Sequence, residues 1–322
     1  MPAGGQTACR GGNNRYTCRR TEDRQMSETV GFIGLGVLGS AIAGHLVAAG
    51  CRVVGCDIDP DRITGLREAG GESAATPRDA ADRADVVFLC LPTAEALHEV
   101  VAGPDGLMHG GGPGQIVVEL STFSIADKEQ ARDALAEEGR ILLDCPVSGN
   151  RIMALQRKLT AFGSGDRAAW ERVESIVGLF TRRRYYVGDF GCGMKMKFCG
   201  NILNLVHNGV AAEIMVLGMK SGLDPKMIHE VISGSGSSSA MFEVRGALMA
   251  ENDYRKEGMN FSIPLKDSRL IAEHAARHLV PTPIYHAALQ NYYAAVAQGH
   301  GEEDQSAVCA AMERAANCER TK

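Results

Sequence analysis

Residues 31–46 read GFIGLGVLGSAIAGHL and place a G-x-G-x-x-G pattern, residues 34–39, between two different kinds of apolar pattern. The run at 30–34 is typical of a buried strand, and 39–49 is typical of a helix. Such a glycine pattern gains meaning when it closes a strand and opens a helix. The first glycine permits the tight turn, the second lets a ligand approach the backbone, and the third lets helix and strand pack closely. We therefore predict a strand–turn–helix unit whose helix N-terminus binds the pyrophosphate of a dinucleotide.

The same alternation of short apolar runs and helical patterns extends to about residue 190. Further strands are expected at 52–56, 85–91, 115–119 and 140–143, and a helix at 61–69. Runs that are apolar throughout are typical of strands covered on both faces. Strand–helix alternation of this kind predicts an α/β fold, a Rossmann-type, doubly wound parallel sheet over residues 27–190.

An acidic residue, Asp57, ends the second predicted strand. At this place a carboxylate binds the adenosine ribose hydroxyls and repels a 2′-phosphate. Ile58, Asp59 and Pro60 follow it, and the first arginine after Asp57 is Arg62. The cofactor expected from these residues is NAD, with NADP less favoured.

The second half of the chain has a different pattern. Residues 194–221 contain no proline and are mostly apolar, which predicts one long helix between the two domains. Asp224-Pro225 begins another helix, and the turn-rich segment 233–239 separates two more. We therefore predict an all-helical domain over residues 191–322, with roles in substrate binding and dimerisation.

The long helix is also apolar enough to raise the question of a membrane span. Residues 198–219 carry one charge, Glu213, over the length that a span requires. Several polar side chains, among them Asn201 and His207, would however lie inside the bilayer at considerable cost. A core helix covered by other helices, from this chain or a second subunit, explains the same composition, and we expect no membrane.

Four polar residues of this helix, Lys197, Asn201, Asn204 and Asn208, are spaced 4, 3 and 4 apart. That spacing places them in one stripe along an otherwise apolar helix. Because buried polar groups need partners, the stripe is expected to line a site. The alternative is a solvated face.

Composition narrows the function classes. Hydrophobic residues at 45% and charged residues at 23% are ordinary for a globular protein. The net charge of −5 argues against a nucleic-acid partner, which favours a basic surface. None of the ten cysteines forms a Cys-x-x-Cys pair, so no metal site is expected. Cysteines in apolar segments favour reduced thiols and a cytoplasmic protein.

The first residues, 1–26, have no apolar periodicity and no hydrophobic run. This argues against a secretory signal, and Glu22 and Asp23 weaken the case for a mitochondrial transit peptide. The segment is expected to be a disordered tail, or an extension translated from upstream of a natural start at Met26.

Four motifs in order resemble those of the β-hydroxyacid dehydrogenase family, the 3-hydroxyisobutyrate dehydrogenase group. They are the glycine turn, ELSTFS at 119–124, DCPVSGN at 144–150 and GCGMKMKFCGN at 191–201. Weaker matches are Lys266-Asp267 in FSIPLKDSRL and the segment GHGEEDQSAV at 299–308. The resemblance implies a Rossmann domain joined to an all-helical domain, paired into homodimers or homotetramers.

The resemblance also implies roles for individual residues. Lys197 would be the catalytic acid/base, which burial suits by lowering the pKa of a lysine. The substrate-binding residues would be Ser148, Gly149, Asn150, Arg151 and Asn201. The cofactor-binding residues would be Gly34, Gly36, Val37, Leu38, Gly39, Asp57, Leu91, Pro92, Ser121, Thr122 and Lys266. The expected reaction is NAD-dependent oxidation of a small 3-hydroxy carboxylic acid, or reduction of the matching aldehyde or keto acid.

The chain departs from the family pattern after Gly149, where Asn150-Arg151-Ile152-Met153 replace the usual glycine and small residues. Asn150 adds an amide, and Arg151 adds a fixed charge with a planar set of donors. The substrate is then more polar or acidic than hydroxyisobutyrate, or else Arg151 points to water. Both interpretations stay open.

Other functions fit the same scaffold. An imine reductase reduces C=N with this fold, but those relatives generally lack the lysine present here as Lys197. A catalytically silent dinucleotide-binding module has no need of Lys197, Asn201 and Ser148 together. A 6-phosphogluconate-type decarboxylase is usually a longer chain, although Arg151 leaves a doubly acidic substrate open.

Overall fold

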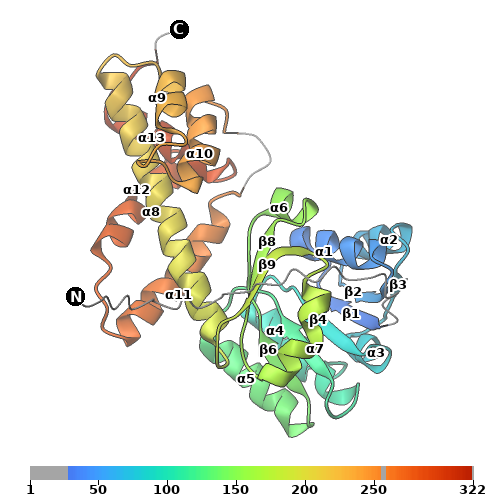
Figure 1. Cartoon of the computed structure of the whole chain (residues 1–322). Coiled ribbons are helices and arrows are strands. Elements are labelled where there is room, and N and C mark those ends of the chain that lie inside the picture. Colours follow the sequence, from blue (N-terminus) through green and yellow to red (C-terminus); the bar gives the residue numbers. More distant parts are fainter. Residues whose placement is uncertain (1–27, 255–258, 321–322) are drawn as a thin grey trace, which may run out of the picture.

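The structure is a computed structural model that describes residues 28–254 and 259–320. The extension predicted at 1–26 lies outside these residues. Figure 1 shows a part built on a sheet and a helical part, connected by the long helix α8 (Cys192–Lys220). Within the described residues, every strand lies before residue 187.

The first part is built on a six-stranded sheet whose strands are all parallel, in the order β3-β2-β1-β4-β5-β6. The strands are β1 (Thr29–Ile33), β2 (Arg52–Cys56), β3 (Glu72–Ser73), β4 (Val86–Leu89), β5 (Ile116–Glu119) and β6 (Ile141–Asp144). The connecting helices are α1 (Val37–Ala48), α2 (Pro60–Glu68), α3 (Pro77–Asp82), α4 (Ala94–Ala102), α5 (Ile125–Glu137) and the 3₁₀ turn η1 (Leu107–His109). This is the strand order of a doubly wound dinucleotide-binding sheet, so the predicted fold class is confirmed.

Both faces of the sheet are covered, as its apolar runs predict. On one face, the Phe32 and Phe88 rings stack with centroids 6.1 Å apart, and Phe180 meets Phe88 edge-on at 5.9 Å. On the other face, Leu89 is buried in a cluster with Leu97 of α4. The two apolar layers anchor the strands, at whose carboxyl ends the predicted site residues lie.

A second, three-stranded sheet follows, which the sequence patterns did not predict. It consists of β7 (Val147–Ser148), β8 (Leu159–Gly163) and β9 (Thr181–Tyr186), with α6 (Arg151–Leu155) and α7 (Arg167–Val177) in the connections. β7 is antiparallel to β8, and β8 is parallel to β9. Two residues are too few to show a period in β7, and the sequence TRRRYY of β9 lacks the apolar run of a buried strand.

The helical part packs around α8. Its helices are α9 (Pro225–Ile232), α10 (Ala240–Glu251), α11 (Ser262–Arg277), α12 (Pro283–Ala297), the 3₁₀ turn η2 (Gln305–Ala307) and α13 (Val308–Ala315). Asp224 accepts a hydrogen bond from the Lys226 amide and so begins α9 where the sequence predicts a helix start. Ser239 caps α10 by accepting from the Phe242 amide.

Among the described residues, α8 is the one helix long and apolar enough to cross a membrane. Its side chains Leu205, Ala212 and Met215 are nevertheless buried in the core of the helical part. Packing within the chain therefore accounts for the apolar residues on the side of α8 that faces this core. Other apolar residues of α8, among them Leu203 and Leu217, are exposed.

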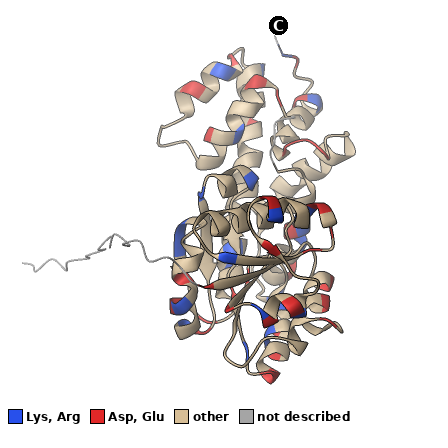
Figure 2. Ribbon diagram, turned by 90° about the vertical axis from the view of Figure 1, so that its right-hand side faces the viewer, with Lys and Arg blue, Asp and Glu red and all other residues tan. Residues whose placement is uncertain are grey.

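Charges are mixed on the outer helices. Figure 2 shows acidic and basic residues side by side on the helices around the sheet. Arg167 and Glu171 of α7 form one such pair, with nitrogen and oxygen 2.9 Å apart. Exposed pairs of this kind contribute little to stability, about 0–1 kcal/mol each.

Candidate active site

The predicted site residues follow the carboxyl ends of parallel strands. Leu91 follows β4, Ser121 and Thr122 follow β5, and the segment containing Ser148 follows β6. In open parallel sheets this edge is where ligands bind. α8 begins at the same edge, because the Met194 amide donates to the carboxylate of Asp144 at the end of β6.

The three glycines of the turn after β1 have different surroundings. Gly34 has φ +89°, and a Cβ there would lie 2.3 Å from the Cys90 carbonyl oxygen. A Cβ on Gly39 would lie 2.0 Å from the Gly34 oxygen. A Cβ on Gly36, in contrast, would meet nothing within 4 Å. The fold itself therefore requires two of the glycines, while Gly36 faces space that a ligand can occupy.

The first turn of α1 offers free donors for that ligand. Its N-cap is Gly36, no side chain caps it, and the turn carries no acidic residue. Val37 and Leu38 stand in this turn, and backbone N–H groups at such a position attract phosphate. These features fit the pyrophosphate of a dinucleotide.

Asp57 is fastened beside the glycine turn. One carboxylate oxygen accepts from the Leu35 amide at 2.6 Å, and the other accepts from the Asp59 amide at 2.8 Å. These bonds hold the carboxylate between the end of β2 and the turn. It is the position that suits a ribose.

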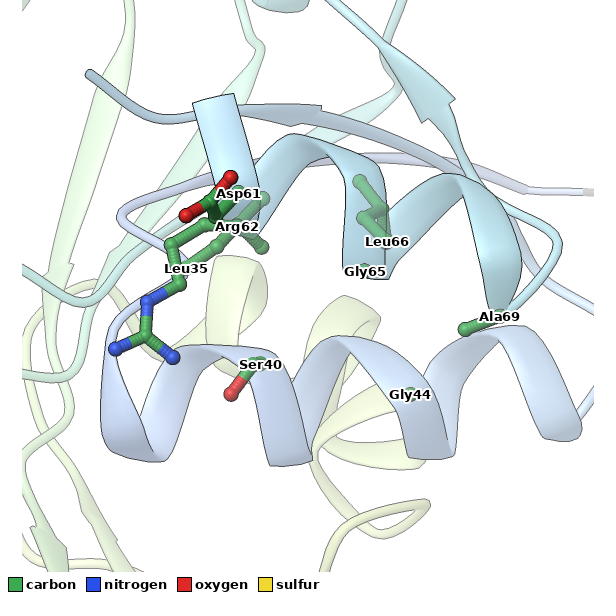
Figure 3. A pocket seen from close by; sticks show the side chains of 8 residues that line it. All are labelled: Leu35, Ser40, Gly44, Asp61, Arg62, Gly65, Leu66 and Ala69. Carbon is green, nitrogen blue, oxygen red and sulfur yellow. The ribbon is translucent and has the colours of Figure 1, made fainter. Parts of the chain in front are cut away.

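A cavity of about 180 Å³ lies between α1 and α2, next to the same turn. Its lining residues are Leu35, Ser40, Gly44, Asp61, Arg62, Gly65, Leu66 and Ala69. Figure 3 shows the Arg62 side chain reaching from α2 toward the first turn of α1. The cavity is lined by the glycine turn, α1 and α2, and its lining does not include Lys197.

Lys197 lies on the first turns of α8. Its ammonium group donates to the Val147 carbonyl oxygen at 2.7 Å, and the side chain is half-buried. Burial lowers the pKa of Lys197 to about 8, Asp267 opposes the shift, and the positive charges of Lys266 and Lys128 add to it. A lysine with this pKa can release and take up a proton near neutral pH.

The segment after Val147 forms the turn between β7 and α6. Ser148 ends β7, and Gly149 has φ +137°, where a Cβ would lie 2.6 Å from Leu159 Cδ2. Asn150 is the N-cap of α6, and its side-chain oxygen accepts from the Met153 amide at 3.0 Å. Arg151 is the first residue of α6 and is exposed. Ser148 and Gly149 thus lie next to the carbonyl that binds Lys197, whereas the Asn150 oxygen is engaged in capping.

A second cluster connects α8 with α11 and with the loop after β5. The Asn201 amide donates to the buried Asp267 carboxylate at 2.8 Å. Lys266 donates to the Thr122 carbonyl oxygen at 2.8 Å and lies 5.8 Å from the Phe123 ring centroid. Lys266 therefore connects the helical part to the sheet edge.

The hydroxyl of Ser121 has a partner within the protein. It accepts from the Leu91 amide at 2.8 Å, and the Ser121 side chain is almost fully buried. Thr122 is half-buried and Pro92 is exposed. Ser121 thus joins the loops after β4 and β5.

The polar stripe of α8 divides between two environments. Asn208 is fully buried and donates to the Tyr292 hydroxyl at 2.8 Å and to the Gln305 carbonyl oxygen at 2.9 Å. The expectation that the whole stripe lines one site is therefore wrong for Asn208. A helix of 29 residues is long enough to run from the sheet edge into the helical core. The same face of α8 therefore lies at the sheet edge at one end and in the helical core further along.

Comparisons with known proteins match the chain along almost its whole described length. Residues 29–188 match the family described as the NAD binding domain of 6-phosphogluconate dehydrogenase. Residues 191–312 match the family described as NAD-binding of NADP-dependent 3-hydroxyisobutyrate dehydrogenase. The chain belongs to the β-hydroxyacid dehydrogenase family.

Three relatives show the range of this family. The L-threonate dehydrogenase of Cupriavidus necator is 34% identical, over 88% of this chain and 95% of its own. The NAD-dependent L-serine dehydrogenase of Pseudomonas aeruginosa is 32% identical, over 87% and 96%. The crystal structure of 3-hydroxyisobutyrate dehydrogenase from Salmonella typhimurium is 31% identical, with a TM-score of 0.78 over 88% and 99%. The chain is thus an oxidoreductase with NAD-binding domains, a dehydrogenase of a small hydroxy acid.

Two groups in this dehydrogenase were missed by the sequence patterns. Lys128 on α5 is fully buried and pairs with Glu119 and Asp144. Asp267 is buried next to Asn201 and influences the pKa of Lys197. In the sequence, Lys128 stands in a charged helix that resembles a solvated one, and Asp267 has no distinguishing signal beyond its position next to Lys266.

Proposed function

We propose that this dehydrogenase oxidises a small 3-hydroxy carboxylic acid with NAD, and that Lys197 moves the proton. The observation that carries the proposal is the placement of Lys197, with its pKa lowered to about 8, one carbonyl away from Ser148 and Gly149. The substrates in the names of the three relatives all carry a carboxylate and a hydroxyl on the β carbon. A site that holds both groups next to a lysine suits that class.

In this oxidation, separate residues transfer the proton, bind the carboxylate and bind the hydroxyl. The neutral amine of Lys197 accepts the hydroxyl proton as the C–H bond of the carbinol carbon breaks. When bound, NAD supplies the nicotinamide ring that accepts the hydride. The Ser148 hydroxyl and the backbone at Gly149 bind the substrate carboxylate, which fixes the carbinol carbon relative to that ring. Asn201, oriented by Asp267, binds the hydroxyl.

The reverse reaction uses the same groups. A protonated Lys197 donates its proton to the carbonyl oxygen of the aldehyde or keto acid. A pKa near 8 leaves both protonation states populated around neutral pH, so one lysine serves both directions.

The test is the substitution Lys197→Ala. General acid–base groups contribute about 10²- to 10⁴-fold, so kcat should fall on that scale. NAD affinity, followed by fluorescence titration, should stay at the wild-type value. The matched control is Lys195→Ala, since Lys195 is an exposed lysine two residues earlier on α8.

Near-wild-type turnover in Lys197→Ala would reject this mechanism. Reduction of cyclic imines by the wild type, with no activity on hydroxy acids, would favour the imine reductase alternative. Absence of turnover on a panel of 3-hydroxy acids and sugar acids, with intact NAD binding, would favour a silent binding module.

We also propose that the protein is a homo-oligomer through α8. Four apolar residues are exposed at seven-residue intervals along this helix, namely Met196, Leu203, Val210 and Leu217. A seven-residue spacing keeps side chains on one side of a helix that packs against another. A Leu203→Asp/Leu217→Asp double variant should lower the mass measured by light scattering, while Leu279→Asp, at an exposed loop residue, should not.

A cytoplasmic location is proposed on chemical grounds. Cys51, Cys56, Cys145 and Cys309 are buried as free thiols in the described part of the chain. Buried unpaired thiols suit a reducing compartment. Cell fractionation with an antibody against the native chain tests this, and recovery outside the cytosol would reject it.

A further inference from the structure

Three charged side chains lie fully buried beneath the site. The Lys128 ammonium is 2.6 Å from a Glu119 carboxylate oxygen and 2.7 Å from an Asp144 carboxylate oxygen. Burial alone would lower the pKa of Lys128, but the two carboxylates outweigh it and its pKa is raised, so Lys128 carries its charge. Burying three charges is costly unless their geometry and hydrogen bonds are good. Because of this desolvation cost, we look for a role of the three charges other than stabilising the fold.

One end of this group holds the start of α8. The second oxygen of Asp144 accepts from the Met194 amide at 2.9 Å and from the Ser164 hydroxyl at 3.0 Å. The Ser164 oxygen in turn accepts from the Gly193 amide at 2.9 Å. A Cβ on Gly193 would lie 2.4 Å from the Phe162 carbonyl oxygen, so α8 is pressed against β8 at this point.

This arrangement fixes Lys197 from two sides. Lys197 follows Met194 by about one helical turn, so its Cα position depends on how the helix starts. Its ammonium group is bound by Val147, three residues after Asp144 along the chain. Asp144 therefore binds the start of the helix that carries the lysine, and it lies three residues before the carbonyl that accepts from the lysine.

The other end of the group reaches the cofactor loops. The first Glu119 oxygen accepts from the Ser121 amide at 2.7 Å, and the Ser121 hydroxyl accepts from the Leu91 amide. A continuous chain of buried polar contacts thus runs from the loop after β4 to the first turn of α8. This chain of contacts connects the predicted cofactor loops with the helix turn that precedes Lys197.

We propose that Glu119, Lys128 and Asp144, together with Ser164, are positioning residues that set Lys197 relative to the substrate and the cofactor. The proposal rests on the role of Lys197 in the proposed function. It adds residues that touch neither substrate nor cofactor. Displacement of a reacting group by about 1 Å can cost on the order of 10²-fold in rate.

The buried charge also acts on Lys197 electrostatically. Lys128 and Lys266 lower the pKa of Lys197, while Asp267 raises it. Removal of the Lys128 charge should therefore raise the pKa of Lys197. Because the neutral amine is the base for oxidation, the rising limb of kcat/KM against pH should then move to higher pH.

The experiment compares Lys128→Met with Arg140→Met in the full chain, with kcat measured at saturating NAD and the KM for NAD measured by varying its concentration. Arg140 is also a buried cation, held by carbonyl oxygens of Leu107 and Gly110 at the opposite end of β6. Both variants should lower Tm. Only Lys128→Met should lower kcat, by about 10- to 100-fold, and shift the pH profile upward, with the KM for NAD unchanged.

Ser164→Ala tests the same inference without changing a charge. It removes the hydroxyl between Gly193 and Asp144, and kcat should fall about tenfold or more while both KM values stay near wild type. This variant decides the matter if Lys128→Met does not fold. Wild-type kcat in Ser164→Ala, or a Lys128→Met variant that differs from wild type only in Tm, as Arg140→Met does, would overturn the positioning role. That outcome is distinct from full activity in Lys197→Ala, which would overturn the proposed function itself.

Discussion

The ammonium nitrogen of Lys197 lies 2.7 Å from the carbonyl oxygen of Val147. Val147 immediately precedes Ser148 in β7, and Lys197 stands on α8, so one hydrogen bond joins the helical part to the serine–glycine turn. The bond also places Lys197, the proposed proton-transfer group, beside the proposed carboxylate site. The pH behaviour of the enzyme should follow from this lysine.

For alcohol oxidation, kcat/KM should rise with pH up to about 8 and then level off. The pKa of Lys197 is lowered to about 8, and the amine accepts a proton only in its neutral form. In the reductive direction the protonated form is needed, so the rate should fall above about 8. Initial rates between pH 6 and 10 in both directions measure this, and parallel profiles in the two directions would contradict it.

The substitution Asp267→Asn tests whether the Asp267 charge raises the pKa of Lys197. The Asp267 carboxylate holds the pKa of Lys197 up, so its neutralisation should move the oxidative profile to lower pH. The asparagine oxygen still accepts from the Asn201 amide, which preserves that contact. A shift to higher pH would show that Asp267 does not act through its charge.

The glycine turn offers a matched pair of substitutions. Gly36→Ala should leave Tm near wild type, because a Cβ there meets nothing within 4 Å, but should raise the KM for NAD. Gly39→Ala should lower Tm, because its Cβ would lie 2.0 Å from the Gly34 oxygen. Thermal melts with and without NAD distinguish the two. Equal NAD affinity in Gly36→Ala and wild type would remove the pyrophosphate from this turn.

Five strands of the six-stranded sheet were predictable because they are buried and leave continuous apolar runs. The edge strand β3 was not predicted, because it has two residues, Glu72 and Ser73, and both are polar and only partly buried. The strands β7 and β9 left no such signal, since β7 has two residues and β9 carries Arg182, Arg183 and Arg184 on the surface. Their pairing depends on contacts distant in sequence. Periodicity within one segment cannot report such contacts.

Site residues likewise divide into those with a local sequence signal and those placed by contacts distant in sequence. Lys197 and Ser148 could be predicted because motifs in order mark them, and the structure brings the two segments together. Lys128 of α5 could not, because its burial depends on two carboxylates contributed by the strands β5 and β6. Spacing along α8 predicted one polar face, but only tertiary packing decides that Asn208 ends in the helical core.

Arg151 bears on substrate choice. If it binds an acidic group of the substrate, Arg151→Ala should raise the substrate KM about tenfold or more, since a charge-assisted hydrogen bond contributes about 1.5–3 kcal/mol. NAD affinity should stay unchanged. Lys158→Ala removes another exposed cation near the same turn and serves as the control. An unchanged KM in Arg151→Ala, on the best substrate of a hydroxy acid panel, would leave Arg151 outside the substrate site.

Asp57 should determine the preference for NAD. Wild-type enzyme should use NAD over NADP by about tenfold or more in kcat/KM, equivalent to about 1.4 kcal/mol, because the carboxylate repels a 2′-phosphate. Asp57→Asn removes the charge, while its amide oxygen can still accept from the Leu35 amide and keep the turn in place. The preference should therefore narrow without a large fall in Tm.

The gain in NADP use should depend on Arg62. This side chain reaches toward the first turn of α1, and its nearest charged partner, Asp59, is 3.6 Å away at an exposed position, which makes the pair weak (Figure 3). Of the two arginines of α2, Arg62 and Arg67, Arg62 is the nearer to position 57 in the sequence. In the Asp57→Asn background, Arg62→Ala should therefore reverse the gain in NADP use. The ratio of kcat/KM for the two cofactors in wild type, Asp57→Asn and the double variant measures both effects. A wild type that prefers NADP would show that Arg62 outweighs Asp57 and that the assignment of NAD from this carboxylate is wrong.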